Sequence, residues 1–375
     1  MSEMNNGRKL RLGVIGLGEG RSIMSAALSS EYWELQRVCD IDPEVCRKRS
    51  KDFEFEATTT NFSALLEDDR IDVIAIYTPD ALHAQHVAEA LTAGKHVICT
   101  KPLMTNLDRG AELLALSREA GKHVFVGQSS RFFEPMLHQR RDFEASKHGE
   151  ILSVESHYNH DHREFMSKPW ARDGKLNWIY GGLSHPVDLV RSYLPDIQEV
   201  MAYGTISPAG RELGQRTSDT IHAIMKTTNG RIASVTGCYG SPHPCEEGKS
   251  LISCIIHGQA GASEACYLDL RYFTHFEGEP QTVHRYPQQA RYYFRFAATD
   301  SHAGEFQNYI DYFARCLQAG LTPKPDLEEG LVTIAVMLAI EQSIKEGKPV
   351  RIADVLASNG LAELIGQLRV PLVKQ

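Results

Sequence analysis

The sequence predicts an α/β protein with two domains. Residues 1–128 are expected to form a doubly wound parallel sheet, and residues 129–375 an α+β domain with a large open mixed or antiparallel sheet. In the first part, segments that are apolar on both faces alternate with helical segments, as in a parallel sheet covered on both sides. After about residue 130, apolar and polar residues alternate within segments, which indicates a sheet with one exposed face.

The elements of the first part follow from this alternation. The predicted strands are residues 10–18, 35–40, 72–78, 96–100 and 123–128, and the predicted helices are residues 21–30, 80–94 and 107–121. The last two helices each end in a glycine, Gly94 and Gly121. Glycine most easily adopts the left-handed conformation of a helix C-cap.

The second part begins with a predicted helix over residues 133–147. The predicted strands are residues 150–160, 199–206, 220–228, 231–240, 251–258 and 265–273, and the closing helices are residues 302–320 and 327–347. No internal repeat or low-complexity linker separates the two parts. The boundary near residue 128 is therefore a change of pattern within a continuous fold.

Composition narrows the classes of function. The chain has 375 residues with 40 basic and 48 acidic side chains, a net charge of -8 that argues against nucleic acid or a membrane surface as partner. No apolar run is long enough to span a membrane, and no signal-peptide pattern is present. The 8 cysteines show no zinc-ligand spacing. We therefore expect a reduced, cytoplasmic enzyme without a metal.

The segment GVIGLGEGRS, residues 13–22, predicts a dinucleotide site of the Rossmann type. Gly16 allows a tight turn and Gly18 a close approach to a pyrophosphate. The third glycine is expected at position 21, but the sequence places it at Gly20. Asp40 ends the second predicted strand, where a carboxylate binds the ribose hydroxyls and repels a 2′-phosphate. NAD is favoured over NADP, and the alternative for Asp40 is a helix N-cap.

The segment YTPDALHAQHVAEALTAGKHVICTKPL, residues 77–103, resembles the central signature of the glucose–fructose oxidoreductase/inositol dehydrogenase (Gfo/Idh/MocA) family. That signature reads T-P-N-x-x-H, followed by A-G-K-H-V-x-x-E-K-P-L. The segments VGQSSRFFEPM, HGEI, GGLSHPVDLVRSYL and IEQSIKEGKPVRI follow in the family's order, so the resemblance covers nearly the whole chain.

The resemblance implies catalytic roles for Lys101 and His185. Lys101 matches the lysine that reaches the nicotinamide and the substrate hydroxyl, and Pro102 matches a proline that commonly follows a cis peptide. His185 matches the family's proton acceptor. The structural alternatives are a surface loop lysine and a buried helix histidine. The predicted cofactor-binding residues are Gly16, Gly18, Gly20, Asp40, Thr78, Pro79, His83, Lys101, Pro102 and Gln128.

The sequence departs from the family pattern at three positions. Thr100 replaces a glutamate, Asp80 an asparagine, and Gly181 an aspartate that many sugar dehydrogenases of the family carry four residues before the histidine. Tyr180, Asp173 or a residue of HYNHDH (157–162) is expected to supply the missing group, and Asp188 either supports His185 or is structural. The predicted substrate contacts are Arg131, His157, Trp170 and Arg172.

These observations predict an NAD-dependent oxidoreductase that acts on a sugar, cyclitol or related polyol. Along a strand, His157, Asn159 and Asp161 would face one way, and Tyr158, His160 and His162 the other. The family's open sheet implies a homodimer or homotetramer. Two alternatives remain: a redox-neutral NAD-using glycosidase of the same family, and a non-catalytic dinucleotide sensor.

Overall fold

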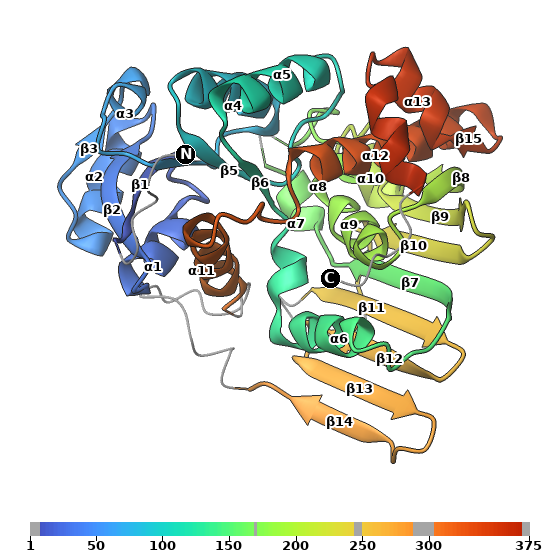
Figure 1. Ribbon diagram of the computed structural model, residues 1–375. Helices are drawn as coiled ribbons and strands as arrows, with labels where there is room; N and C mark the ends of the chain where they lie inside the picture. Colours follow the sequence, from blue (N-terminus) through green and yellow to red (C-terminus); the bar gives the residue numbers. More distant parts are fainter. Residues whose placement is uncertain (1–7, 169–170, 244–249, 288–303, 370–375) are drawn as a thin grey trace. The chain divides into compact units, whose positions relative to one another are not determined.

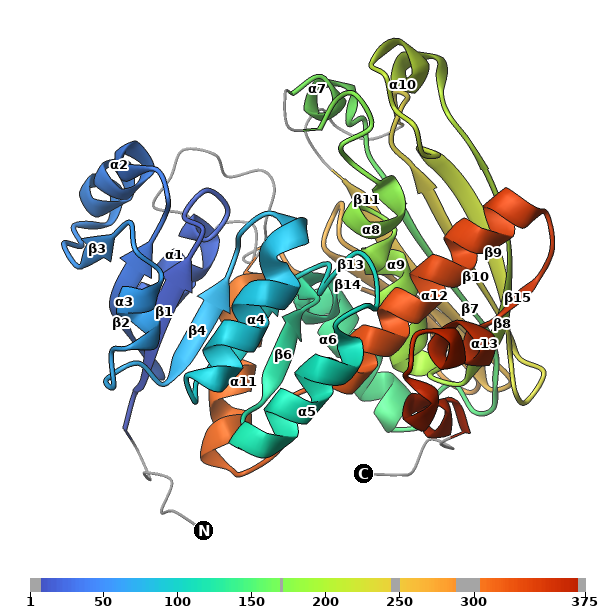
Figure 2. The same cartoon turned by 90° about the horizontal axis from the view of Figure 1, so that it is seen from above.

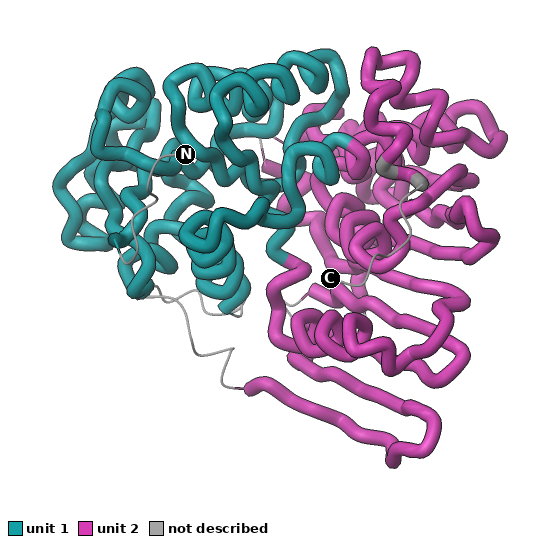
Figure 3. Tube along the Cα trace, in the orientation of Figure 1, with its two compact units in different colours: residues 1–129, 293–297, 304–331 teal, residues 130–292, 298–303, 332–375 magenta. Residues whose placement is uncertain are grey.

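The computed structural model describes residues 8–168, 171–243, 250–287 and 304–369, which form two compact units (Figures 1 and 3). Of these residues, the first unit contains 8–129 and 304–331, and the second unit contains the remainder. Each unit has its own sheet.

The first unit is built on a parallel sheet with the strand order β3-β2-β1-β4-β5-β6. The strands are β1 (Leu10–Ile15), β2 (Trp33–Cys39), β3 (Thr58–Thr59), β4 (Val73–Ile76), β5 (His96–Thr100) and β6 (Val124–Gly127). Every residue of β4 and β6 is buried, as the continuous apolar runs predict. The strand order reverses at β1, and ligands of such sheets bind beside this point, at the carboxyl ends of the strands.

Helices cover both faces of this sheet. They are α1 (Arg21–Ser29), α2 (Pro43–Phe53), α3 (Ser63–Leu66), α4 (His83–Thr92), α5 (Gly110–Ala120) and α11 (Glu305–Gln318). Figures 1 and 2 show α4 and α5 along one face and α1 with α11 along the other. Gly94 and Gly121 have φ angles of 70° and 62°, so the predicted left-handed ends of α4 and α5 are confirmed.

Helix α11 belongs to the first unit, which differs from the predicted division at residue 128. The Trp33 indole N–H donates to the Ile310 carbonyl at 3.0 Å, and the Ser30 hydroxyl donates to Asp311 at 2.6 Å. Tyr309 and Phe313 are fully buried beside Phe125 of β6. The apolar stripe of α11 thus covers a face of the parallel sheet from far along the chain.

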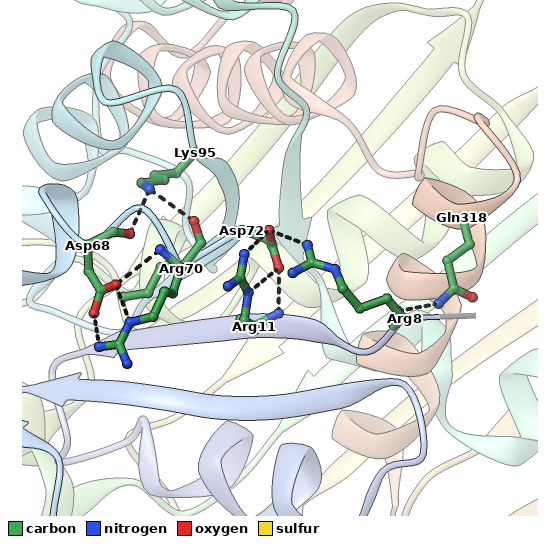
Figure 4. Close-up of polar contacts among 8 residues, drawn as sticks. Arg8, Arg11, Asp68, Arg70, Asp72, Lys95 and Gln318 are labelled. Carbon is green, nitrogen blue, oxygen red and sulfur yellow. Dashed lines mark hydrogen bonds and ion pairs between the residues drawn. The ribbon is translucent and has the colours of Figure 1, made fainter. Parts of the chain in front are cut away.

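Ion pairs and side-chain hydrogen bonds fix the amino ends of strands in the first unit (Figure 4). Asp72, just before β4, accepts hydrogen bonds from the Arg11 backbone at 2.9 Å and the Arg11 side chain at 3.2 Å. Arg8 also donates to it, at 2.8 Å. Lys95, before β5, is 6% exposed and donates to the carbonyls of Asp68 and Ile71 at 2.9 and 3.0 Å. These contacts lie at the amino ends of the strands, opposite the carboxyl ends where ligands bind.

The second unit is built on a mixed sheet with the strand order β14-β13-β12-β11-β7-β10-β9-β8-β15. The strands are β7 (Ile151–Asn159), β8 (Ile197–Thr205), β9 (Thr220–Thr227), β10 (Ile232–Cys238), β11 (Leu251–Gly258), β12 (Gly261–Cys266), β13 (Arg271–Phe276), β14 (Thr282–Arg285) and β15 (Val350–Arg351). β7 and β10 are parallel, and the other pairs of neighbouring strands in this sheet are antiparallel. The predicted α/β class with a second, mixed sheet is confirmed.

Helices pack on one face of this mixed sheet. α9 (Ser184–Tyr193) lies against β7, β10 and β11, and α6 (Glu134–Glu144) lies against β12 and β13. The other helical elements are η2 (Ser129–Phe132), α7 (Arg163–Met166), α8 (Trp178–Gly181), α10 (Pro208–Glu212), α12 (Leu327–Glu346), α13 (Ile352–Ser358) and η4 (Ala362–Arg369). In β9, exposed and buried residues alternate strictly, so the other face remains open within the unit.

One predicted strand, residues 265–273, is wrong. The chain reverses between Cys266 and Arg271, so the segment contributes to two antiparallel strands, β12 and β13. Leu270 has a left-handed φ of 48°, and both Tyr267 and Leu270 are buried. The apolar pattern therefore continues through the turn, and no glycine or proline marks it.

Candidate active site

The loop between β1 and α1 has a conformation that requires glycine at two positions. Gly16 has a φ of 85°, and a Cβ there would lie 2.5 Å from the Tyr77 carbonyl oxygen. A Cβ at Gly20 would lie 2.4 Å from the Gly16 carbonyl oxygen, so Gly20 takes the place of the motif's third glycine. A Cβ at Gly18 would meet nothing within 4 Å. The backbone at Gly18 is therefore open to a ligand at the start of α1.

Asp40 lies directly after β2 and supports this loop. Its carboxylate accepts from the Leu17 N–H at 2.7 Å and from the Asp42 N–H at 3.0 Å. The N-cap of α2 is Asp42, which accepts from the Glu44 N–H at 2.8 Å. The helix-cap alternative for Asp40 is therefore wrong. Each Asp40 oxygen keeps a lone pair for a ribose hydroxyl, since a carboxylate has about four acceptor positions.

His83 holds together the turns after β4 and β5. Its ring nitrogens lie 2.6 Å from the Pro102 carbonyl oxygen and 2.7 Å from the Thr78 carbonyl oxygen. The side chain is 0% exposed. His83 was predicted to bind the cofactor, but its burial and these two contacts make it a support for the turns. Thr78 itself hydrogen-bonds through its hydroxyl to His86 at 3.0 Å, and Pro79 begins the following turn.

Lys101 follows β5 at the carboxyl edge of the parallel sheet. The Lys101–Pro102 peptide is cis, as the family resemblance suggested. The side chain is partly exposed. Burial lowers the pKa of Lys101 below its usual range, while the carboxylates of Asp80 and Glu19 act in the opposite direction. A lysine with a lowered pKa is suited to proton transfer as well as to charge stabilisation.

Gln128 presents an unsatisfied polar atom just after β6. The residue is 2% exposed, and its Oε1 has no hydrogen-bond partner among the described residues. A buried acceptor without a donor costs about 1–3 kcal/mol, so such an atom is commonly satisfied by a ligand or water. Together with the open backbone at Gly18 and the carboxylate of Asp40, this oxygen fits a bound dinucleotide.

In the second unit, His185 and Asp188 of α9 are joined to η2. The His185 Nδ1 lies 3.3 Å from the Ser130 hydroxyl. Arg131 donates to both carboxylate oxygens of Asp188, at 2.6 and 2.8 Å, and the Asp188 side chain is 1% exposed. Arg131 was predicted as a substrate contact, and Asp188 as either a support for the histidine or a structural residue. The structure pairs them with each other, in a bidentate contact that fixes the helix carrying His185.

One ring of an aromatic cluster, that of Tyr158, contacts His185 on the helix-covered face of the sheet. The ring of Tyr158 in β7 lies 5.5 Å from the His185 ring, edge to face. The Tyr158 hydroxyl lies 3.1 Å from the His162 Nε2, and the rings of His162, Trp178 and Tyr239 are stacked. Tyr158 lies within residues 157–162, one of which was predicted to supply the missing group, whereas Trp178 and Tyr239 were not predicted as site residues. The sequence signal here was the spacing of apolar residues around residues 157–162. This spacing does not distinguish residues of the hydrophobic core from residues of the active site.

The strand pattern predicted for residues 157–162 holds only as far as Asn159. β7 ends there, and α7 begins at Arg163, so the period-two assignment of Asp161 and His162 is wrong. His157 does lie on β7, where its Nε2 is 2.8 Å from the Ser253 hydroxyl of β11. It is the chain neighbour of Tyr158 and therefore points to the opposite, open face of the sheet.

Two of the candidates for the missing aspartate have other contacts. The Tyr180 hydroxyl donates to Glu341 at 2.8 Å. Burial and the Glu341 carboxylate raise the pKa of Tyr180, so the phenol is a neutral donor in the working pH range. Asp173 is 61% exposed and lies 3.4 Å from Arg172, which is 49% exposed. At Gly181 a Cβ would meet only Leu176, at 3.4 Å. Trp170 lies outside the described residues.

Comparison with known proteins identifies the family. Residues 10–128 match the family model described as an oxidoreductase family, NAD-binding Rossmann fold, and residues 144–352 match the C-terminal alpha/beta domain of the same family. The chain belongs to the Gfo/Idh/MocA oxidoreductase family. The predicted family, fold class and NAD cofactor are thereby confirmed.

Relatives within the Gfo/Idh/MocA family include named dehydrogenases. A 1-carboxy-3-chloro-3,4-dihydroxycyclohexa-1,5-diene dehydrogenase of Comamonas testosteroni is 29% identical over 60% of this chain and 57% of that protein. A D-xylose 1-dehydrogenase (NADP(+)) of Haloferax volcanii is 25% identical over 91% of this chain and 98% of that protein. The chain thus aligns with little more than half of the Comamonas protein.

A solved structure shares the fold. An oxidoreductase from Agrobacterium radiobacter, in complex with NAD+, L-tartaric acid and magnesium, has a TM-score of 0.82 and 20% identity, covering 93% of this chain and 100% of that one. In the described residues of the present chain, no group of three or more His, Cys, Asp or Glu side chains is placed to hold a metal ion. No helix in the same residues is both long and apolar enough to cross a membrane.

Proposed function

We propose that this Gfo/Idh/MocA protein is an NAD-dependent dehydrogenase that oxidises a carbinol of a sugar, cyclitol or related polyol. The observation that carries the proposal is the position of Lys101 at the carboxyl end of β5, where burial lowers the pKa of its ammonium group. Relatives that are named as dehydrogenases of a cyclic diol and of D-xylose support the substrate class.

The cofactor would be held by the glycine loop, Asp40 and Gln128 of the first unit. Gly18 and the start of α1 would receive the pyrophosphate, and Asp40 the ribose hydroxyls. Bound NAD supplies the acceptor for the hydride that leaves the carbinol carbon.

His185 and Lys101 would manage the proton of the substrate hydroxyl. A neutral imidazole that donates Nδ1–H to Ser130 carries its lone pair on Nε2, which can accept that proton. The Lys101 ammonium would stabilise the alkoxide as negative charge develops on oxygen. The Arg131–Asp188 pair would hold α9, and therefore His185, in place.

A substrate panel tests the proposal. The purified protein is incubated with NAD and, in turn, myo-inositol, D-xylose, other aldoses and cis-diols of cyclohexadiene, and NADH formation is followed by absorbance. We expect net NADH with at least one ring polyol. His185→Ala should lower turnover by roughly 10²–10⁴ while NADH affinity stays near that of the unmodified protein. Conversion of a glycoside without net NADH would instead support the redox-neutral alternative.

The open face of the mixed sheet supports a homo-oligomer as part of the proposal. Tyr203, Ile224, Ile232 and Val283 are 69%, 62%, 53% and 49% exposed. They belong to β8, β9, β10 and β14, and the cross-strand register places them on one face of the sheet. Tyr203, Ile224 and Ile232 lie on the neighbouring strands β8, β9 and β10 and form an exposed apolar patch, which is typical of an interface. Val283 lies on β14, at the other end of the strand order.

A further inference from the structure

A buried arginine lies beneath the glycine loop. Arg49 of α2 is 6% exposed, and its Nε donates to the Leu17 carbonyl at 2.8 Å. One of its terminal nitrogens lies 3.4 Å from the Gly18 carbonyl oxygen. The other donates to Asp52 at 2.8 Å, which balances the charge of the guanidinium. A buried cation is thus directed at two consecutive carbonyl groups of the loop.

These contacts fix the direction of the loop's amide groups. In a planar trans peptide, the C=O of one residue and the N–H of the next point in opposite directions. When the carbonyls of Leu17 and Gly18 face Arg49, the N–H groups of Gly18 and Glu19 must point away from it. The Leu17 N–H is held separately by Asp40, at 2.7 Å. Arg49 and Asp40 therefore fix three consecutive peptide groups of the loop.

The charge of Arg49 also strengthens those donors. A cation on the carbonyl side polarises a peptide group and makes its N–H a better donor to an anion. A ligand can approach the backbone at Gly18, because a Cβ there would meet nothing within 4 Å.

We infer that Arg49 is a positioning residue for the pyrophosphate of the dinucleotide. It acts through the loop, by orienting the N–H groups of Gly18 and Glu19 toward the phosphates. The inference rests on NAD binding by this domain, which is tested first by titrating the unmodified protein with NADH. The competing explanation is that Arg49 only stabilises the packing of α2 against the loop.

The test compares ligands with and without the pyrophosphate. Arg49→Met and Arg49→Lys are titrated with NADH and ADP-ribose by fluorescence and calorimetry, and adenosine affinity is measured by competition. The control is Arg47→Met, because Arg47 lies on the same helix but is 65% exposed and pairs with Glu44. We expect Arg49→Met to weaken NADH and ADP-ribose by about tenfold, the usual effect of losing charge-assisted hydrogen bonds. Adenosine affinity should change less than about twofold.

The outcomes are distinct. Arg49→Lys should show a smaller loss than Arg49→Met, since an ammonium can replace part of the contact with the carbonyls. If Arg49→Met fails to fold, the NADH and adenosine affinities of Arg49→Lys distinguish the positioning role from a purely structural role. Unchanged NADH affinity in either Arg49 variant, or an equal loss for adenosine and NADH, would overturn the inference. Absence of NADH binding by the unmodified protein would overturn the cofactor assignment as well.

Discussion

Asp40 both supports the glycine loop and bears on the choice between NAD and NADP. Its two hydrogen bonds to backbone N–H groups hold a carboxylate at the end of β2, at 2.7 and 3.0 Å. The following residue, Ile41, is 90% exposed and carries no charge. A fixed negative charge beside an uncharged surface residue favours ribose hydroxyls over a 2′-phosphate.

The first prediction concerns this choice. The unmodified protein should bind NADH at least about tenfold more tightly than NADPH, because the carboxylate repels the additional phosphate. Asp40→Ser combined with Ile41→Arg should narrow the difference. Fluorescence titration with both dinucleotides measures it. Equal affinities for NADH and NADPH in the unmodified protein would contradict the assignment of NAD as the preferred cofactor. The alternative is a preference for NADP, the cofactor for which the Haloferax relative is named.

At the scale of elements, the turns after β4 and β5 depend on each other through His83. One ring nitrogen lies 2.6 Å from the Pro102 carbonyl oxygen and the other 2.7 Å from the Thr78 carbonyl oxygen, so a single side chain joins the two turns. Lys101 immediately precedes one of these carbonyl groups. Its position is therefore set by a buried contact with another loop.

The second prediction follows from this arrangement. His83→Gln should lower turnover by about tenfold or more, since a displacement of about 1 Å at a reacting group is enough for such a loss. Steady-state kinetics with the substrate found in the panel provides the measurement. Gln85→Ala is the control, because Gln85 lies on the same helix and pairs only with Glu89 among its described contacts. Unchanged kinetics in His83→Gln would show that Lys101 is positioned without it.

The third prediction concerns the opposite edge of the sheet. Burial alone would raise the pKa of Asp72, but hydrogen bonds from Arg11 and Arg8 outweigh it, and the net pKa is lowered. A carboxyl with a lowered folded-state pKa stabilises the fold above its unfolded pKa of about 3.9. That contribution is lost as the pH falls through the folded-state value. Acid should therefore weaken this edge.

Asp72→Asn tests the contribution. At pH 7 the variant should have a free energy of unfolding about 1–3 kcal/mol below that of the unmodified protein, and the difference should shrink below about pH 4. Urea unfolding at both pH values measures it. Glu44→Gln, which breaks an exposed pair on α2, should have little effect. A difference that is the same at both pH values would show that the charge of Asp72 is not responsible.

At the scale of the whole molecule, the fourth prediction concerns assembly. Ile224→Asp should convert a homo-oligomer to smaller species, because it places a charge on the strand between the exposed side chains of Tyr203 and Ile232. Light scattering after size exclusion measures the mass. Arg47→Asp is the control, since Arg47 is an exposed residue of α2 in the first unit and does not belong to the open face. A monomeric unmodified protein would contradict the proposal.

Local sequence patterns predicted most of the elements and much of the site. The strand at His96–Thr100 was predicted to the residue, because a largely buried strand between a glycine cap and a proline has clear limits. Gly16 and Asp40 were identified because their roles depend on local backbone conformation and on a position at a strand end. The reversal at Tyr267–Leu270 was missed, because three of its four residues are apolar and Tyr267 and Leu270 are buried like the flanking strands.

The sequence by itself determined the parallel sheet, the glycine loop, the NAD-type carboxylate and the family, since each depends on residues that are close together in the chain or on a recognisable motif. Only the tertiary structure decided that α11 joins the first unit, that Arg131 pairs with Asp188, that His83 supports the Lys101 turn and that Arg49 lies beneath the loop. The partners in these contacts are brought together by strand order and helix packing. Their local sequence would be equally compatible with solvent exposure.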